Sequence, residues 1–281
     1  MKEHRPEYGS ASLFRDTAGL GRDEAQDLVA RLELRAKAED EVAARAEYLT
    51  LMELRPGERV LDVGCGSGVV TRDIARRIEP HGQVVGIDPS PALIAAARAL
   101  VQSSGWASLV ELQEGDCRAL PFAAESFDAA IAATVLNHVP DGERAVPEMV
   151  RVVRRGGRVG VFDFDGDGLL IAHPDREMTR RIVAAASDHG AANSWLVREL
   201  PALLAATGLE DIRVRAFMPL ERRGDGFYAG MAERAATVAR EKGAITDEQH
   251  AEWTEALRRQ VDGGRFLCGR LHLFCWGRKP L

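Results

Sequence analysis

The chain has 281 residues, a formal net charge of −6, and a composition with 46% hydrophobic and 28% charged residues, as expected of a soluble globular protein. The acidic balance argues against nucleic acid as a main partner, because phosphate backbones usually bind to basic surfaces. No apolar run approaches the roughly 20 residues of a membrane span, and the first residues contain no hydrophobic secretory signal.

The N-terminal part of the chain is predicted to be helical. Residues 1–20 contain turn formers and one small apolar cluster, which suits an arm or a flap. Apolar residues recur near helical spacing amid dense charge over residues 23–52, and this pattern predicts one long helix or two shorter ones. A turn at residues 55–58 ends the segment. We therefore predict that residues 1–57 form an N-terminal helical arm or lid.

A buried strand followed by a glycine loop lies at the centre of the sequence. The mostly apolar run 59–63 predicts the strand, and Gly64, Gly66 and Gly68 follow it directly. Because glycines free the loop of side chains, a ligand can press against backbone N–H groups at the start of the next helix. Asp88 ends the next apolar run about 20 residues later, which is the spacing of a nucleoside-binding half of a doubly wound sheet.

The spacing of these glycines differs from that of a dinucleotide-binding loop. Such a loop follows G-x-G-x-x-G, where a helix N-terminus meets a pyrophosphate. Here Ser67 and Gly68 follow the second glycine, and Val69 stands where the third glycine of the fingerprint is required. This tighter pattern favours a ligand that lacks a pyrophosphate.

The rest of the chain alternates between strand and helix patterns, which predicts a parallel sheet with right-handed crossovers. Most of the strand runs are almost continuously apolar, as expected for strands buried on both faces. The predicted strands span residues 59–63, 83–88, 109–114, 127–133, 158–164, 209–217 and 266–276. The predicted helices that accompany them span residues 69–78, 91–102, 143–153, 176–188 and 196–207.

A helical stretch between the last two strands is too long for an ordinary loop. We interpret residues 224–264 as an inserted helical cap over the ligand site. The core of the fold then consists of residues 58–223 and 265–281. The predicted fold class is α/β, with a doubly wound, Rossmann-like sheet.

Five motifs occur in order along this core: the glycine loop 61–68, the acid Asp88, the loop 115–122, the strand and loop 127–138, and the helix end and turn 151–157. Together they resemble the class I S-adenosylmethionine-dependent methyltransferases, especially the small-molecule group that includes the quinone-pathway enzymes. The resemblance covers residues 58–165 closely and 170–281 only in architecture. It implies a seven-stranded, mostly parallel sheet with an antiparallel last strand, and S-adenosyl-L-methionine as the cofactor.

The resemblance also implies roles for residues in these motifs. The loop glycines would let the methionine part of the cofactor lie against the backbone. Asp62 would accept a hydrogen bond from the ammonium group, and Asp88 would accept two from the ribose hydroxyls. Asp116 would accept one from the adenine amine, and the Cys117 N–H would donate to a ring nitrogen. The cofactor set also contains Cys65, Pro89 and Thr134, the last of these beside the methionine part.

For several of these residues, a purely structural role is the alternative to cofactor binding. Asp88 is then a cap of the following helix, and Asp116 a turn residue. Cys65 and Cys117 are expected to be small packing residues rather than nucleophiles. The four cysteines of the chain are scattered without a Cys-x-x-Cys pair, which argues against a zinc site or a disulfide framework and makes a reducing cytoplasm the expected compartment.

An aspartate-rich stretch at residues 163–168 imitates the opening of a calcium loop. The bidentate glutamate that such a loop requires at its twelfth position is replaced by Pro174, and no helix precedes the stretch. No metal site is therefore predicted. The alternating aspartates are expected at a substrate-side edge or in a solvated turn.

Methyl transfer from a sulfonium depends mainly on placing the nucleophile, and a base is needed only when the acceptor must lose a proton. His138 is the best candidate for that base, because it lies just past strand 127–133, where the methyl group should point. A structural histidine is the alternative. The candidate substrate-binding residues are Asn137, His173, Trp195 and Tyr228.

The predicted function is methyl transfer to O, N or C of a small organic acceptor, such as a natural-product, phenolic or quinone-like metabolite. One alternative is an enzyme of the same fold that uses the cofactor for another reaction, such as cyclisation or hydrolysis. A second alternative is a non-catalytic binding module. The expected partner is the small-molecule acceptor, and neither nucleic-acid binding nor a membrane span is expected. A homodimer is one possible oligomeric state.

Overall fold

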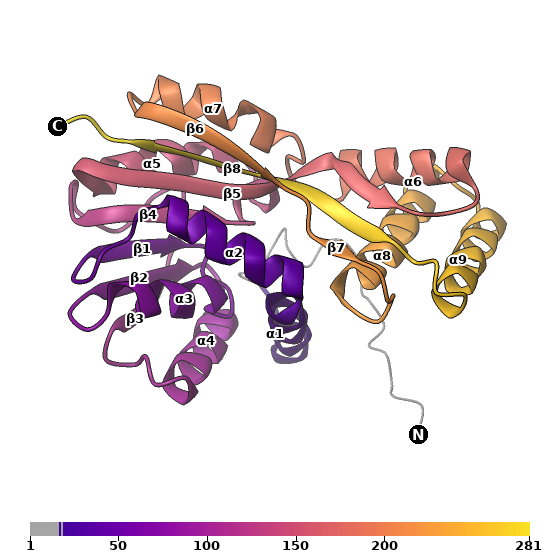
Figure 1. The fold of residues 1–281 in the computed structure, drawn as a ribbon, viewed down its shortest axis with the longest axis horizontal. Helices are drawn as coiled ribbons and strands as arrows, with labels where there is room; N and C mark the ends of the chain where they lie inside the picture. The colour runs from indigo at the N-terminus through magenta and orange to yellow at the C-terminus, as the bar shows by residue number, and fades with distance from the viewer. Residues whose placement is uncertain (1–16, 18) are drawn as a thin grey trace.

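The computed structural model describes residue 17 and residues 19–281, and these form a three-layered α/β fold (Figure 1). The arm or flap predicted for residues 1–20 falls almost entirely outside the described residues. The strands are β1 (Arg59–Val63), β2 (Gln83–Asp88), β3 (Val110–Glu114), β4 (Phe127–Ala133), β5 (Val153–Ile171), β6 (Glu210–Phe217), β7 (Leu220–Glu221) and β8 (Cys268–Arg278). Their order in the sheet is β3-β2-β1-β4-β5-β8-β6, and the short β7 pairs with β8.

The pairing pattern matches the predicted fold class. β1 to β5 pair in parallel, whereas β8 runs antiparallel to β5, β6 and β7. The predicted antiparallel last strand is therefore confirmed. The described sheet has eight strands rather than seven because the two-residue β7 adds to the edge of β8.

Helices cover both faces of the sheet (Figure 1). The predicted helical segment at residues 23–52 consists of two helices, α1 and α2. Side chains of α2 and α3 pack on one face, and those of α5 and α7 pack on the other. None of the helices in the described chain has the length and apolarity needed to cross a membrane. The bounds are α1 (Arg22–Lys37), α2 (Glu39–Leu51), α3 (Val69–Ile78), α4 (Pro91–Ser103), α5 (Ala145–Val152), α6 (Arg176–His189), α7 (Leu196–Ala206), α8 (Phe227–Glu241) and α9 (Asp247–Asp262).

Burial on both faces explains the apolar sequence of the central strands. In β1, Val60 packs with α2 and α3, whereas Leu61 and Val63 pack with the core that contains α5 and α7. Successive side chains of a strand point to opposite faces, so a central parallel strand needs apolar residues at nearly every position. Asp62 is the exception in β1, and it lines the cavity described below.

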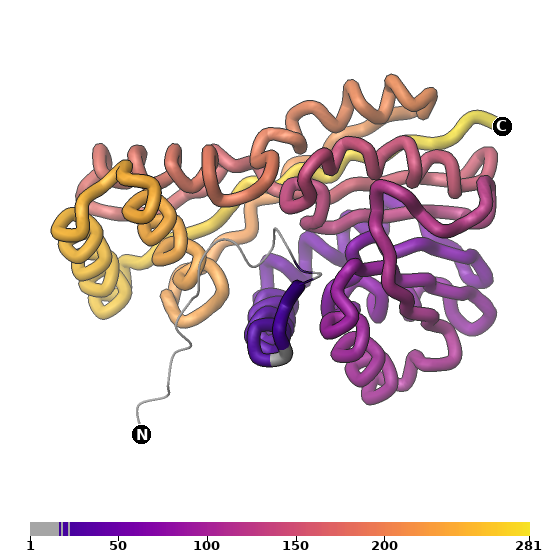
Figure 2. The backbone as a smooth tube through the Cα atoms, turned by 180° about the vertical axis from the view of Figure 1, so that it is seen from behind, coloured from indigo at the N-terminus to yellow at the C-terminus, as the bar shows by residue number. Residues whose placement is uncertain are grey.

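The two longest strands, β5 and β8, extend beyond the rest of the sheet into a helical lobe (Figure 1). Figure 2 shows the same lobe from behind, with α6, α8 and α9 gathered at one end of the molecule. Leu169 of β5 and Cys268 of β8 belong to the hydrophobic core of this lobe, together with Ile182, Tyr228 and Trp253 from the helices. The lobe therefore has a core of its own, built around the ends of two sheet strands.

The prediction that the fifth strand ends at residue 164 was wrong. β5 passes through an irregular segment after Phe164 and then pairs again with β8 from Leu169 to Ile171. The expectation of a solvated turn was also wrong for Asp163 and Asp165, which are 1% and 4% exposed. Asp163 accepts backbone hydrogen bonds, and Arg198 pairs with Asp165, so both carboxylates are satisfied inside the protein.

Candidate active site

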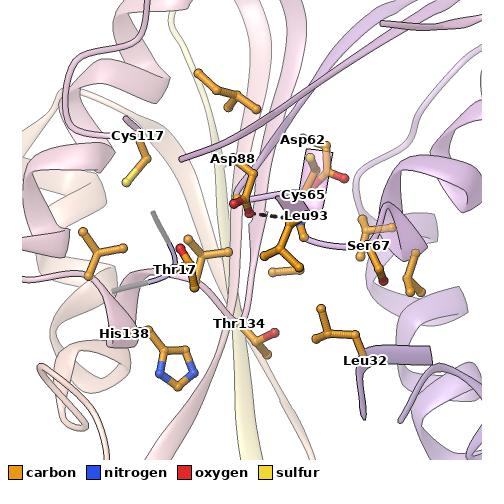
Figure 3. Close-up of a pocket in the computed structure, with 18 of the residues that line it drawn as sticks. Thr17, Leu32, Asp62, Cys65, Ser67, Asp88, Leu93, Cys117, Thr134 and His138 are labelled. Carbon is orange, nitrogen blue, oxygen red and sulfur yellow. Dashed lines mark hydrogen bonds between the residues drawn. The ribbon is translucent and has the colours of Figure 1, made fainter. Parts of the chain in front are cut away.

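A cavity of about 370 Å³ lies at the carboxyl ends of β1, β2 and β4 (Figure 3). The strand order reverses between β1 and β4, and a switch point of this kind leaves a crevice outside the strand ends. The cavity has a size typical of small-molecule and cofactor sites. The predicted cofactor-binding residues that line it are Asp62, Gly64, Cys65, Gly66, Asp88, Pro89, Asp116, Cys117 and Thr134.

The glycine loop curls around one side of this cavity. Gly64, Gly66 and Gly68 have φ angles of +70°, +53° and +76°, a backbone region that residues with a Cβ rarely adopt. A Cβ added to Gly64 would also lie 2.5 Å from the side chain of Val135. Gly68 does not line the cavity but is the N-cap residue that precedes α3. The loop therefore needs glycine for its own geometry as well as for access to the backbone.

Asp88 holds the glycine loop to the end of β2. Its Oδ2 accepts a hydrogen bond of 3.0 Å from the Gly66 N–H, and its Oδ1 accepts one of 3.0 Å from the Ser90 N–H. Burial raises the pKa of Asp88, whereas these two hydrogen bonds act to lower it. Each carboxylate oxygen can accept a second hydrogen bond, so Asp88 can both order the loop and bind vicinal hydroxyls. The sequence-based alternatives of a structural and a ligand-binding Asp88 are therefore compatible.

Asp62 is a carboxylate buried at the end of β1, with 1% of its surface exposed. Its Oδ2 accepts a hydrogen bond of 2.5 Å from the Thr71 hydroxyl on α3. Burial raises the pKa of Asp62 to about 7, with nearby Asp88 adding to the rise and Thr71 opposing it. A cationic group of a ligand would compensate this buried carboxylate.

The loop after β3 places Asp116 and Cys117 on the cavity wall. The carboxylate of Asp116 pairs with the Arg118 guanidinium at 2.8 Å, and this partner lowers the pKa of Asp116. Burial raises the pKa of the Cys117 thiol to about 11 and that of Cys65 well above its ordinary value. Both thiols are therefore protonated at neutral pH, which favours packing over nucleophilic roles.

A second cavity of about 130 Å³ adjoins the first. Four residues line both cavities: Leu32, Arg35, Thr134 and His138. Figure 3 shows Leu32, Thr134 and His138 together at one end of the first cavity, on the far side of Asp88 from Cys117. The ring of His138 lies 5.3 Å from that of Phe164, which lines the second cavity. His138 therefore stands where the two cavities meet.

Arg35 and its partners at this boundary were missed by the sequence analysis. The Arg35 guanidinium lies 2.9 Å from Glu41, donates to the Thr134 hydroxyl at 3.0 Å, and lies 3.3 Å from Nε2 of His272. The hydroxyl of Tyr228 donates to Glu41 at 2.5 Å. This network ties α1, α2, α8 and β8 to the loop after β4.

His272 within this network is held as a neutral imidazole. Burial and the Arg35 cation together lower its pKa to about 3. Its Nδ1 lies 2.9 Å from the carbonyl oxygen of Arg270, which can only accept, so Nδ1 carries the proton and Nε2 accepts from Arg35. Arg270 and His272 share one face of β8, and this pair of polar residues in an apolar strand was an available sequence signal.

The four predicted substrate-binding residues do not line either cavity. Asn137 donates to the Phe164 carbonyl at 2.5 Å and is fully buried, so it joins the loop after β4 to β5. His173 stacks on Trp253 within the helical lobe. Trp195 is 50% exposed and stacks on Arg198. Tyr228 donates its hydroxyl hydrogen bond to Glu41, which itself lines the larger cavity. The contacts described for these four side chains are thus with other protein groups, and none of the four belongs to the lining of the two adjoining cavities.

No group of three or more potential metal ligands is present among the described residues. Asp163 accepts from the Asn137 and Phe164 N–H groups, and burial raises its pKa to about 6. Asp165 forms a two-point pair with Arg198 at 2.6 and 2.8 Å. The aspartate-rich stretch thus serves to join β5 to its neighbours.

Comparisons with known proteins agree with this geometry. Residues 61–161 match the family described as "Methyltransferase domain". An uncharacterized 37.1 kDa protein in transposon TN4556 of Streptomyces fradiae is 34% identical over 182 residues, covering 65% of this chain and 52% of that protein. A demethylmenaquinone methyltransferase of Desulfitobacterium hafniense is 35% identical over 119 residues, covering 42% of this chain and 47% of that protein. The chain thus spans about half the length of the curated relatives it matches.

The fold is also similar to that of a solved structure, the YcgJ protein from Bacillus subtilis. The two share 20% sequence identity with a TM-score of 0.62, over 85% of this chain and 99% of that one. Residues 61–161 form a class I S-adenosylmethionine-dependent methyltransferase domain. The donor set of the larger cavity fits the cofactor of this class, because it offers a buried carboxylate at Asp62, a second at Asp88 and an open glycine loop between them.

Proposed function

We propose that the protein transfers a methyl group from S-adenosylmethionine to O, N or C of a small organic acceptor. The observation that carries this proposal is the pair of adjoining cavities that share Leu32, Arg35, Thr134 and His138. In this proposal the larger cavity holds the cofactor and the smaller one holds the acceptor. The apolar and aromatic side chains in the walls of the smaller cavity suit a natural-product, phenolic or quinone-like acceptor.

In the larger cavity, Asp62 is proposed to bind the ammonium group and Asp88 the two ribose hydroxyls. When bound, S-adenosylmethionine supplies an electrophilic methyl group on a positively charged sulfur. The protein's part is to align the acceptor with that group and to exclude water. Asp116 and Cys117 are proposed to bind the adenine, with Cys65, Pro89, Gly64 and Gly66 completing the wall. Thr134 accepts a hydrogen bond from Arg35, and we propose that it lies on the side of the cofactor that faces the acceptor.

His138 is proposed as the base where the acceptor must lose a proton. Its support is its position on the walls of both cavities. General-base catalysis contributes about 10²- to 10⁴-fold, so His138→Ala should lower turnover by that amount, a much larger change than any in cofactor affinity. Turnover equal to that of the wild type would show that transfer proceeds by alignment alone.

The direct test is incubation with labelled S-adenosylmethionine and a panel of candidate acceptors, followed by mass analysis. The expected product is the acceptor with one added methyl group, together with the demethylated cofactor. Cofactor binding with a changed acceptor of unaltered mass would favour cyclisation on the same fold. Absence of calorimetric binding of S-adenosylhomocysteine would overturn the proposal and favour a binding module.

The other parts of the proposal concern partners and domain organisation. We infer a small-molecule acceptor rather than nucleic acid from the net charge of −6, and a cytoplasmic location from the unpaired cysteines. Residues 224–264 are proposed to cap the acceptor, since α8 contributes Phe227, Met231 and Arg234 to the smaller cavity. Size-exclusion chromatography with light scattering will determine whether the chain is a homodimer.

A further inference from the structure

The smaller cavity has an unusual charge distribution. Four arginines line it, and no aspartate or glutamate is among its described lining residues. The arginines come from three elements that are distant in sequence: Arg31 and Arg35 from α1, Arg234 from α8, and Arg270 from β8. Guanidinium groups are charged at all physiological pH values, so this wall presents cationic groups to the cavity.

Aromatic rings hold several of these guanidinium groups in place. Arg270 lies over the ring of Phe164 at 3.7 Å, and Arg35 and Arg234 each lie 5.6 Å from the ring centre of Phe227. Such cation–π contacts orient a guanidinium without neutralising it. Arg35 is neutralised by Glu41, as described above.

Arg270 has no acidic partner among the described residues. Its side chain makes neither an ion pair nor a hydrogen bond within the part of the chain that the structure describes, and its Nε is fully buried. Tyr228 and Asp163 both act electrostatically to raise the pKa of Arg270. The two carboxylate oxygens of Asp163, however, accept from backbone N–H groups. Burial lowers the pKa of Arg270 to about 10, which still leaves it charged at neutral pH. A buried charge without a partner is costly, and an anionic ligand beside Arg270 would offset that cost.

The two ends of the smaller cavity are lined by different kinds of residue. Thr134 and His138 line both cavities, whereas Arg234 and Arg270 line only the smaller one. The apolar wall between these ends is formed by side chains from α1, β5 and α8: Leu32, Phe164, Leu169, Phe227, Met231 and Val238. An acceptor that fills this space has a reactive end beside His138, an apolar middle, and an end that meets guanidinium groups.

We propose that the acceptor is an apolar or aromatic molecule carrying a carboxylate or phosphate group, which Arg270 binds with Arg234 beside it. This inference rests on the proposed function, because it assigns the smaller cavity to the acceptor. A neutral quinone-like acceptor would leave Arg270 buried without an anion. Guanidinium groups suit these oxyanions because their planar N–H donors can bind two oxygens at once.

The experiment measures binding of matched probes to the full chain by calorimetry, with S-adenosylhomocysteine present to fill the larger cavity. The probes are 4-hydroxybenzoate, phenyl phosphate and the neutral 4-hydroxybenzamide. At least one anionic probe is expected to bind about 10- to 100-fold more tightly than the amide, the range for hydrogen bonds to a charged group. The two anionic probes distinguish a carboxylate from a phosphate. Equal binding of all three, or binding of none, would overturn the inference.

The matched variants are Arg270→Met, which keeps the apolar stem, and Arg258→Gln, an exposed control on α9. Arg270→Met should weaken the anionic probe about 10- to 100-fold and leave amide and S-adenosylhomocysteine binding unchanged. Its Tm should not fall, because an unpaired buried charge is removed. A lower Tm with undiminished anion binding would instead give Arg270 a structural role. Arg234→Met supplies a second variant with the same expected direction.

S-adenosylhomocysteine binding separates the two possible failures. If it is absent from the wild-type protein, the proposed function itself fails. If S-adenosylhomocysteine binds but the anionic probes show no preference over the amide, only the inference about the acceptor fails.

Discussion

The two cavities differ in how the chain builds them. Most of the larger cavity comes from successive strand ends and loops between Asp62 and Pro140, with α1 and α2 closing one side. The smaller cavity combines α1, β5, α6, α8 and β8, so its residues span Arg31 to His272. Short sequence motifs can therefore describe the first cavity, whereas the second exists only after the helical lobe has packed on the sheet.

The two cavities also differ in charge. Buried carboxylates, Asp62 and Asp88, characterise the larger one, and guanidinium groups characterise the smaller one. A cationic ligand beside the first group and an anionic ligand beside the second would compensate both. Variants that affect one cavity and leave the other intact will therefore test whether they act as separate binding sites.

The largest effect is expected for Asp88→Ala in the larger cavity. The variant removes the two oxygens that we propose accept from the ribose, and with them the carboxylate that orders the Gly66 and Ser90 N–H groups. Hydrogen bonds to a charged group contribute about 1.5–3 kcal/mol each, so affinity for S-adenosylhomocysteine should fall at least about 100-fold. Calorimetry measures this directly.

Asp88→Asn is the matched control for that variant. The asparagine side chain has nearly the same shape as aspartate and keeps one acceptor oxygen. Asp88→Asn should therefore lose less affinity for S-adenosylhomocysteine than Asp88→Ala. An affinity within twofold of the wild type for Asp88→Ala would mean that the ribose lies elsewhere.

The second prediction concerns the pH dependence that Asp62 gives to the protein without ligand. Its pKa lies at about 7 in the folded chain, above its ordinary value of 3.8, because burial disfavours the charged form. The stability contributed by its protonation is fully present below pH 3.8 and is lost as the pH rises to about 7. The slope is at most about 1.4 kcal/mol of unfolding free energy per pH unit.

Urea unfolding of the wild type and of Asp62→Asn between pH 5 and 7.5 measures this slope. The difference between the two proteins should change with pH in the stated direction, since all other titrating groups are shared. Saturating cofactor should reduce the difference, because a cationic ligand favours the charged carboxylate. Profiles that stay parallel without ligand would contradict the assignment.

The same contrast explains what could be predicted from sequence. β1, α3 and β4 lie at the predicted bounds, because strand and helix periodicities are local and glycine marks the turn between them. Asp62 and Asp88 were recognisable because their positions are fixed relative to a strand end. Neither the continuation of β5 past Phe164 nor the pairing of Arg35 with His272 has a local signal, since both depend on where β8 lies.

The third prediction concerns the Tyr228–Glu41 hydrogen bond near the boundary between the two cavities. Tyr228→Phe removes the hydroxyl that donates to Glu41, leaving that buried carboxylate with Arg35 as its main partner. The free energy of unfolding should fall by about 1–3 kcal/mol, the usual cost of losing one partner of a buried polar group. Because Glu41 also orients Arg35 at the boundary between the cavities, the KM for the acceptor should change more than the cofactor affinity.

A double-mutant cycle with Glu41→Gln isolates the contribution of this hydrogen bond. Additive effects of the two substitutions would show that the hydroxyl does not stabilise Glu41. A change confined to cofactor affinity would indicate that the network serves the larger cavity instead.

The smallest effect is expected for Trp195→Ala, at a residue that the sequence predicted to bind substrate. Its ring is 50% exposed and stacks on Arg198 at 4.2 Å, outside the lining of both cavities. Stability should change by no more than about 0.5 kcal/mol, as for most surface substitutions, and acceptor KM should stay within twofold of the wild type. Phe164→Leu is the contrasting variant, because that ring lines the smaller cavity and supports Arg270. Since both variants shorten an aromatic side chain, a raised KM for Trp195→Ala alone would place the acceptor outside the smaller cavity, on the exposed side of α7.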